Sequence, residues 1–294
     1  MRCCSGKSEG CDMEKTHIEK NTVQETLVIP LFGRKLCTEQ FPNLFQDPKA
    51  VELIERIDYD FSPLEAKASG MGYRFGALEV AMRESDLMIE AGAYLSEHPK
   101  AALVNLGCGL DQTAENCDNG QCRICNIDLP DVIAVRNELL PESDRVKNLA
   151  ADLNDLSWFD EIDASNGVFF LAAGVFYYFK TEDMKTLLPA MAQRFPGGRL
   201  CFDAANKRAV KIMLKTWVKD AGVTSISDYF KVDSLEADIL PWMTNARVTS
   251  RGYMLGYNDL RDPSVPGAFR LLAKIADRFM NMQIIRMDFE KEGA

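Results

Sequence analysis

Apolar and polar positions follow a helical pattern in the first third of the chain. From Gln24 to about Glu97, apolar residues recur three and four positions apart, which places them on one face of a helix. One such segment opens at Pro48, a residue favoured at the first helical position, and runs to Ile57. A second covers residues 76–95. We expect these segments to form a helical lid that precedes the main sheet.

After His98 the pattern changes to short apolar runs separated by helical segments, which is typical of parallel strands joined by crossover helices. The expected strands are residues 101–106, 122–127, 146–149, 167–171, 199–202, 245–253 and 283–289. The expected helices are residues 130–140, 181–195, 207–221 and 269–280. This alternation predicts an α/β fold with a doubly wound, seven-stranded, mostly parallel, Rossmann-like sheet.

The length of 294 residues is compatible with one elaborated domain, which is our starting interpretation. We expect residues 1–97 to form an N-terminal tail and the helical lid, and residues 98–294 to form the core with a late insertion around residues 224–245. Residues 1 to about 20 are polar and lack periodicity, so we expect a frayed start.

Charge and composition exclude several classes of partner. The net charge of −10 would repel nucleic acid, whose phosphates require basic surfaces. No apolar run approaches the roughly 18 residues that span a bilayer, and the start of the chain lacks the apolar stretch of a signal peptide. Nine cysteines, an odd number, favour reduced thiols over disulfides. We therefore expect a cytoplasmic protein that binds neither membrane nor nucleic acid; no pattern specifies an oligomeric state.

The strongest chemical signal directly follows the first expected strand, in Val104-Asn-Leu-Gly-Cys-Gly-Leu-Asp111. Glycines at the carboxyl end of a strand let the backbone turn tightly and approach a ligand, and ligands bind at that edge of open α/β sheets. A tight turn without a ligand is the alternative for this segment alone. About 20 residues later, Asp128 ends the second strand, where a carboxylate can accept hydrogen bonds from a ribose diol.

The two signals together predict a cofactor that contains a nucleoside. Gln112 occupies the place of the third glycine in the pyrophosphate-binding pattern, so a nicotinamide dinucleotide is not specified. S-adenosyl-L-methionine (SAM) contains no phosphate and needs no such glycine. After the third strand, Asp152 stands where its carboxylate could accept from the adenine amine, although Asp152 or Asn154 could equally be a helix N-cap.

A series of motifs resembles the leucine carboxyl methyltransferase family, which includes polyketide O-methyltransferases of the tetracenomycin type. The likeness covers about residues 70–205 and is carried by Gly70-Met-Gly-Tyr-Arg74, Val104-Asn-Leu-Gly-Cys-Gly-Leu-Asp111, Asn126-Ile-Asp-Leu-Pro-Asp-Val-Ile133, Ala151-Asp-Leu-Asn-Asp-Leu-Ser-Trp158, Ala173-Gly-Val-Phe-Tyr-Tyr-Phe179 and Phe195-Pro-Gly-Gly-Arg-Leu-Cys-Phe-Asp203. The resemblance implies a class I methyltransferase fold, SAM as the cofactor and methyl transfer to an oxygen of a small molecule.

The resemblance also implies roles for single residues. Arg74 would approach the SAM carboxylate, and Asp128 would hold the ribose. The full set of expected cofactor-binding residues is Arg74, Gly107, Cys108, Gly109, Asp111, Asp128, Leu129, Asp152, Leu153 and Ala173, of which Gly107 and its neighbours would line the methionine and Asp152 with Leu153 would flank the adenine. The chain departs from the family at Ala173, where members usually carry Glu, so a contact to the cofactor's amino group would be missing or supplied from elsewhere.

Methyl transfer from a sulfonium is an in-line displacement, so positioning supplies most of the catalysis. The chain has two histidines, His17 and His98, and neither is placed to act as a base. A carboxylate acceptor is already ionised, so it needs no base, whereas a phenol would benefit from one. Candidates for orienting an anionic acceptor are Tyr177, Tyr178, Lys180, Arg247 and Arg251, and we name Tyr177 and Arg74 as the candidate catalytic residues.

Three other interpretations of the sequence exist. Cys117, Cys122 and Cys125 have a spacing seen in iron–sulfur proteins, but two of them fall in or beside an expected strand, so we expect no metal. Ala173 motivates a catalytically impaired SAM-binding regulatory protein. A nicotinamide-dependent reductase rests on the sheet and Asp128 alone.

Overall fold

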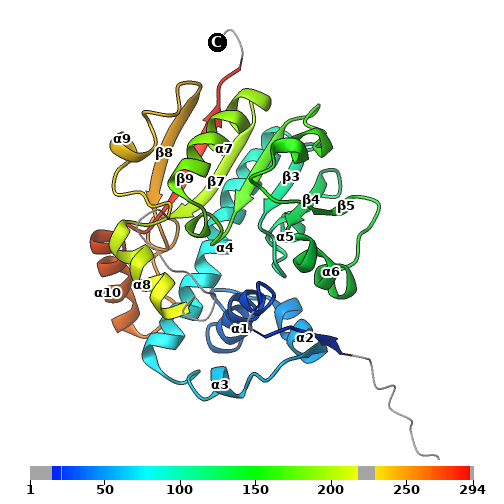
Figure 1. Ribbon diagram of the computed structural model, residues 1–294. Coiled ribbons are helices and arrows are strands. Elements are labelled where there is room, and N and C mark those ends of the chain that lie inside the picture. The colour runs from blue at the N-terminus through cyan, green and yellow to red at the C-terminus, as the bar shows by residue number, and fades with distance from the viewer. Residues whose placement is uncertain (1–14, 21, 218–228, 292–294) are drawn as a thin grey trace, which may run out of the picture.

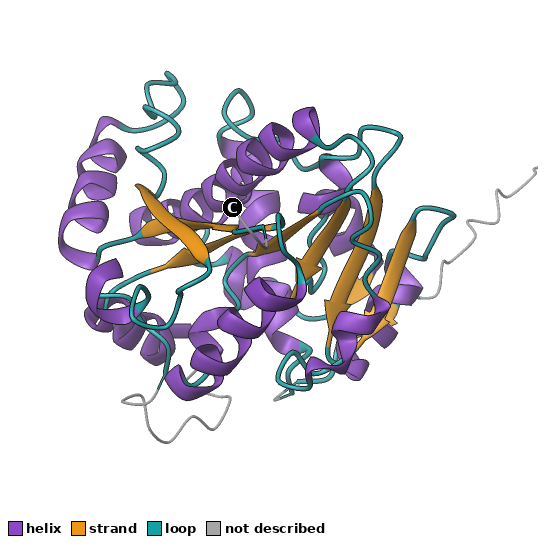
Figure 2. Ribbon diagram, turned by 90° about the horizontal axis from the view of Figure 1, so that it is seen from above, coloured by secondary structure: helices purple, strands orange, loops and turns teal. Residues whose placement is uncertain are grey.

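A computed structural model describes residues 15–20, 22–217 and 229–291. Its centre is a seven-stranded sheet with helices on both faces (Figures 1 and 2). The strands are β3 (Ala102–Leu106), β4 (Arg123–Asp128), β5 (Val146–Ala150), β6 (Val168–Ala172), β7 (Arg199–Ala204), β8 (Ala246–Gly252) and β9 (Gln283–Phe289). Each lies within a residue or two of its predicted range, and the α/β class is confirmed.

The strand order across the sheet is β5-β4-β3-β6-β7-β9-β8. All neighbours are parallel from β5 to β7, whereas β9 runs antiparallel to both β7 and β8. The order reverses direction between β3 and β6, and crevices at such reversals are the usual ligand sites of doubly wound sheets. The glycine loop that follows β3 begins at this reversal.

The helices after β3 are α5 (Thr113–Asn116), α6 (Pro130–Leu139), α7 (Thr181–Arg194), α8 (Lys207–Trp217), α9 (Leu235–Asp238) and α10 (Gly267–Ile275). Short helical turns are η1 (Leu156–Glu161), η2 (Phe176–Tyr178) and the π-helical η3 (Ala276–Met280). The helix predicted over residues 269–280 therefore changes geometry after Ile275. The last four residues of the helix predicted over 207–221 lie outside the described residues, as does part of the predicted insertion around residues 224–245.

The segment before the sheet contains α1 (Glu25–Gln40), α2 (Pro48–Arg56), α3 (Ser62–Glu65) and α4 (Met71–Glu97). Asp47 caps α2, since its carboxylate accepts from the Ala50 N–H at 2.8 Å. The expectation of a frayed start is wrong for part of its range, because β1 (Thr16–His17) pairs in parallel with β2 (Ile57–Asp58), where Ile18 is buried. Two residues carry too little periodicity to indicate a strand. The rest of that start, residues 1–14, lies outside the described part.

The core has a layer on each face of the sheet, as the alternation of side chains along a strand requires. In β3, Val104 and Leu106 pack into the layer that also contains Phe170, whereas Leu103 packs into the opposite layer with Phe169. Every residue of β3 and β6 is buried, which explains why β6 is a continuous apolar run and why β3 is apolar except for Asn105. In the described parts of the chain, each helix is too short or too polar to cross a bilayer.

The long helix α4 carries a carboxyl group inside the core. Asp86 is 0% exposed and accepts hydrogen bonds from the Met254 N–H at 3.0 Å and from Asn258 Nδ2 at 3.1 Å. Burial raises the pKa of Asp86 to about 8, despite those two hydrogen bonds. The carboxyl therefore resists ionisation at neutral pH.

Asp86→Asn is expected to make folding stability less sensitive to pH. Because the folded-state pKa of Asp86 lies above its unfolded value, its contribution is complete below about pH 4 and is lost as pH rises towards 8. Denaturant unfolding measures the fall in the free energy of unfolding between pH 6 and pH 8. In Asp86→Asn this fall should be smaller than in the unaltered protein by up to about 2 kcal/mol. The matched control is Asp118→Asn: Arg145 lowers the pKa of Asp118 to about 2, so this change should shift both measurements equally. An unchanged pH slope in Asp86→Asn would contradict the assignment.

Candidate functional site

The loop after β3 makes the tight turn that its glycines predict. Gly107 and Gly109 have φ values of +63° and +48°, a left-handed conformation that favours glycine. A Cβ atom on Gly107 would lie 2.6 Å from Val175 Cγ2, which is too close for any side chain. Glycine at position 107 is therefore required both by backbone conformation and by the approach of the loop that follows β6.

Asp128, the last residue of β4, meets this loop. Its carboxylate accepts from the Gly109 N–H and from the Leu129 N–H, both at 2.8 Å. The side chain is half-buried, and burial raises the pKa of Asp128 while the two backbone N–H groups oppose that rise. The carboxylate is thus fixed in orientation and partly accessible at the end of the sheet. The structure brings together the two strand ends on which the nucleoside hypothesis depends.

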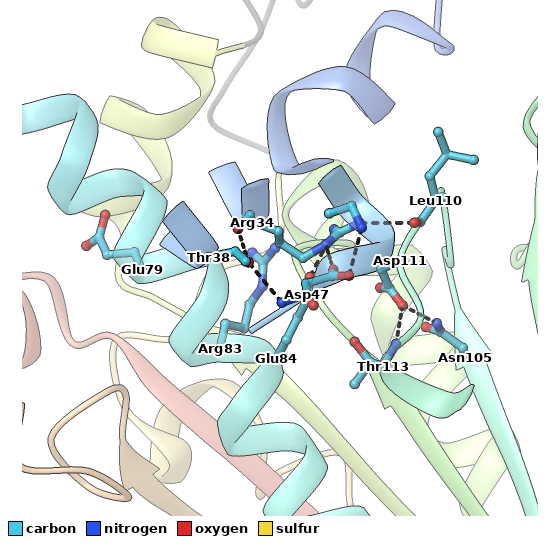
Figure 3. Close-up of polar contacts among 12 residues, drawn as sticks. Arg34, Thr38, Asp47, Glu79, Arg83, Glu84, Asn105, Leu110, Asp111 and Thr113 are labelled. Atoms are coloured by element: carbon cyan, nitrogen blue, oxygen red, sulfur yellow. Dashed lines mark hydrogen bonds and ion pairs between the residues drawn. The ribbon is translucent and has the colours of Figure 1, made fainter. Parts of the chain in front are cut away.

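Other predicted residues of the loop lie beneath its surface. Cys108 is 1% exposed, and burial raises its thiol pKa well above the ordinary value, so the thiol stays protonated. Asp111 is buried, and its carboxylate accepts from Asn105 Nδ2 at 2.7 Å and from the Thr113 N–H at 3.0 Å (Figure 3). Both residues support the loop from inside.

The predicted adenine-side residues follow β5. The Asp152 side chain is exposed, and its Oδ1 accepts from the Asn154 N–H at 2.9 Å. It therefore caps a local turn and still presents carboxylate to solvent. Leu153 is buried in the core, and its carbonyl accepts from Trp158 Nε1 at 3.3 Å.

A second polar group, which the sequence analysis did not assign, lies at the ends of β6 and β7. Asp203 accepts from the Gly174 N–H at 2.6 Å and from Arg83 Nη1 at 3.3 Å. Gly174 has a φ of +73°, and a Cβ there would lie 2.5 Å from Arg83 Nη1, so the guanidinium lies directly against this glycine. The Tyr177 hydroxyl also donates to Asp203, and burial raises the Tyr177 pKa well above its ordinary value.

Arg83 has an unused donor. Among the described residues, its buried Nε has no hydrogen-bond partner. A buried guanidinium with a free N–H is suited to bind a carboxylate. The sequence gives no distinct signal for this role, because Arg83 stands among other charged residues of α4, with Glu79 before it and Glu84 and Asp86 after it.

Arg74, the predicted contact to the cofactor carboxylate, lies in the first turn of α4. Its Nε donates to Gln40 Oε1, and its guanidinium lies over the rings of Phe41 and Phe269 at 5.5 and 5.7 Å from their centroids. These contacts join α4 to α1 and α10. Ala173 is half-buried at the end of β6, beside Gly174.

The site fits the parts of SAM. Two glycines leave backbone accessible beside the Asp128 carboxylate, which suits a ribose and its sulfur-side neighbour. The Arg83 guanidinium, which lies against Gly174 just beyond β6, supplies a cation that suits the methionine carboxylate.

The model of the leucine carboxyl methyltransferase family matches residues 31–192 of this chain. A similar relative is the tetracenomycin polyketide synthesis O-methyltransferase TcmP of Streptomyces glaucescens, 32% identical over 183 residues that make up 62% of this chain and 66% of that protein. The chain thus spans just under two thirds of that relative's length. The SAM-dependent methyltransferase dpfgK of Gibberella zeae is 24% identical over 75% of this chain and 78% of its own.

Two solved structures share the fold. One, described as a methyltransferase from Thermobifida fusca, has a TM-score of 0.56 at 15% identity and covers 80% of this chain and 90% of its own. The other, a DUF574 family protein from Streptomyces avermitilis, has a TM-score of 0.54 at 10% identity and covers 79% and 91%. The family match covers more than half of the chain. This chain therefore belongs to the leucine carboxyl methyltransferase family of SAM-dependent methyltransferases.

Proposed function

We propose that this protein transfers the methyl group of SAM to an oxygen atom of a small-molecule acceptor, either a carboxylate or a phenolic, polyketide-like compound. The observation that carries the proposal is the contact between the Gly109 N–H and the Asp128 carboxylate at the reversal of strand order. The O-methyltransferase TcmP among the relatives supports oxygen as the acceptor atom.

We assign the cofactor's parts to this chain as follows. The backbone at Gly107 and Gly109 lines the methionine side, Asp128 holds the ribose hydroxyls, and Asp152 with Leu153 flanks the adenine. Arg83 is the better placed candidate for the carboxylate, since its guanidinium lies against Gly174 at the strand ends, whereas Arg74 is already engaged by Gln40 and two aromatic rings. When bound, SAM supplies an electrophilic methyl group.

Tyr177 and its neighbours suit an acceptor that is ionised before it binds. Tyr177 is 6% exposed, and burial together with Asp203 raises the pKa of its hydroxyl well above the ordinary value, so the hydroxyl stays protonated and does not act as a base. His17 pairs with Asp58 on the surface, and His98 lies against Tyr94, so neither supplies a base here. A carboxylate acceptor needs none, which favours it over a phenol.

A basic hollow lies beside Tyr177, beyond the end of β7. Tyr177 packs against Ala205, Ala209 and Val210. Asn206, the residue after Ala205, lines the hollow. The hollow, of about 590 Å³, is lined by Asn206, Lys207, Arg208, Lys211, Asp233, Arg278 and Phe279. Four cations and one carboxylate, in a protein of net charge −10, favour an anionic acceptor with an apolar body. Arg247 and Arg251 lie on the edge strand β8, so the hollow is the better candidate for this role.

A direct assay tests the proposal. The purified protein, SAM and a panel of aromatic and polyketide-like acids and phenols should yield S-adenosylhomocysteine (SAH) and an O-methylated product, both detected by mass spectrometry. Titration calorimetry should show SAM binding. Absence of SAM binding at millimolar concentration would refute the proposal. Tight binding without turnover of any acceptor would favour the regulatory alternative, which the comparisons do not support.

Charge reversal at Arg208 is expected to weaken acceptor binding. Arg208→Glu places a carboxylate beside the acceptor's anionic group, so we expect KM for an anionic acceptor to rise about tenfold with little change in kcat. Steady-state kinetics at low ionic strength should measure this, since screening weakens the effect at high salt. Lys274→Glu makes the same charge change on α10 outside the hollow and should leave KM within twofold. An equal rise in KM for a neutral acceptor would exclude an electrostatic role.

A further inference from the structure

A buried arginine in the lid contacts the cofactor loop. Arg34 of α1 is 2% exposed, and its three nitrogens have three different partners (Figure 3). Nε donates to Asp47 at 2.8 Å, and Nη1 donates to Glu84 of α4 at 3.1 Å. Nη2 donates to the carbonyl of Leu110 at 3.0 Å. One guanidinium thus joins α1, α4, the cap of α2 and the loop that follows β3.

Apolar contacts join the same two segments. The Leu110 side chain is 3% exposed and packs in the cluster formed by Leu27, Val28 and Leu31 of α1. A Cβ atom on Gly109 would lie 3.1 Å from Leu27 Cδ2, so α1 also covers the neighbouring loop residue. The lid therefore contacts Gly109, whose N–H donates to the Asp128 carboxylate, and the next residue, Leu110.

A second buried arginine holds the loop from the other side. Arg136 of α6 is 0% exposed, and its Nη1 donates to the Gly109 carbonyl at 2.9 Å and to the Asp111 carbonyl at 2.8 Å. Three successive carbonyls therefore each accept from a guanidinium. Because Arg136 comes from the sheet domain and Arg34 from the lid, the loop backbone is fully fixed only when α1 is docked.

We infer that Arg34 is a positioning residue which couples the docking of lid helix α1 to binding of the cofactor. This inference rests on the proposed function. Arginine suits the position, since the three nitrogens of its planar guanidinium reach three separate acceptors. The single nitrogen of a lysine cannot span the same three positions. Coupling between two sites is reciprocal, so the cofactor must stabilise the docked α1 by the same factor by which docked α1 strengthens cofactor binding.

Hydrogen exchange and calorimetry on the full chain test the coupling, with SAH as the ligand. In the unaltered protein, SAH is expected to slow amide exchange in residues 25–40 as well as in residues 107–113. In Arg34→Lys, which keeps the charge and removes the fork, the SAH Kd should rise about tenfold, as for loss of one hydrogen bond to a charged group. Exchange in residues 107–113 should rise, and SAH should protect α1 less.

The control is Arg199→Lys. Arg199 is also a buried arginine, and its Nε donates to Asp288. It is the first residue of β7, so it lies at the edge of the sheet opposite to the one where the glycine loop follows β3. Arg199→Lys should reduce stability and leave the SAH Kd within twofold. If Arg34→Lys also leaves the SAH Kd within twofold, Arg34 only stabilises the fold and the inference fails.

The remaining outcomes also separate the two proposals. If Arg34→Lys does not fold, the exchange of α1 in the unaltered protein decides, since unchanged exchange on SAH binding overturns the coupling. If the unaltered protein does not bind SAH, the proposed function fails. The exchange of residues 107–113 in the two ligand-free proteins then still decides whether Arg34 fixes the loop.

Discussion

Asp128→Asn is expected to weaken SAH binding at least about 100-fold, which corresponds to about 2.7 kcal/mol. The Asp128 carboxylate accepts from the Gly109 and Leu129 N–H groups, and hydrogen bonds to a charged acceptor contribute about 1.5–3 kcal/mol each. An asparagine keeps the size of the side chain and one acceptor oxygen, but it turns an NH₂ group towards one of those N–H donors. The loop loses an anchor, and the ribose that we propose binds at Asp128 loses an anionic partner.

Titration calorimetry with SAH measures this effect, and circular dichroism verifies that the variant is folded. Asp131→Asn is the matched control: Asp131 lies three residues later, in the first turn of α6, and its side chain is exposed. It should change the SAH Kd less than twofold. An Asp128→Asn protein that binds SAH as tightly as the unaltered chain would remove the main support for the site.

The sequence predicted the sheet and the meeting of the Gly109 loop with Asp128 because both depend on local signals. A buried strand, two glycines and an aspartate at the end of the next strand lie within 25 residues of each other, from Val104 to Asp128. Parallel neighbouring strands must end at the same edge, so the meeting of Gly109 with Asp128 follows from strand order alone. The positions of these residues at the ends of neighbouring strands were sufficient to predict that they meet.

The partners of the buried arginines could not be predicted in this way. Arg83 and Asp203 are separated by 120 residues, and Arg34 and Leu110 by 76. Their contacts depend on how α1 and α4 pack against the sheet, which no periodicity specifies. The resemblance directed attention to Arg74, nine residues before Arg83 on the same helix, and whether either binds the cofactor remains a prediction. The short strand β1 was missed for a related reason, since it is defined only by its pairing with β2.

Arg34, Arg136 and Arg83 have a common relation to the candidate site. Arg34 and Arg136 bind carbonyls of the glycine loop, and Arg83 binds Asp203 beside Gly174. Two of them therefore hold loop backbone and the third holds a side chain at the carboxyl end of a strand, in a protein whose overall charge is strongly negative. Buried cations are costly unless they are paired and hydrogen-bonded, so their concentration around two glycine turns indicates that the backbone there must be held in place.

Gly107→Ala is expected to abolish measurable SAH binding and to destabilise the fold by about 2–4 kcal/mol, because it combines two costs. An alanine at a φ of +63° is strained by about 1–2 kcal/mol, and its Cβ would lie 2.6 Å from Val175 Cγ2. Gly120→Ala separates these costs, since Gly120 has a φ of +79° with no atom within 4 Å of the added Cβ. It should lose only about 1–2 kcal/mol and keep SAH affinity.

Denaturant unfolding and calorimetry on both variants give the comparison. The double variant Gly107→Ala/Val175→Ala lacks the two methyl contacts at 2.6 and 2.7 Å and keeps only the Val175 Cβ at 3.2 Å, so its stability should rise from that of Gly107→Ala towards that of Gly120→Ala. If Gly107→Ala were no less stable than Gly120→Ala, the contact with Val175 would carry no cost, and the loops after β3 and β6 would not be packed together as described. That result would also remove the steric reason for glycine at position 107, which we propose lines the cofactor.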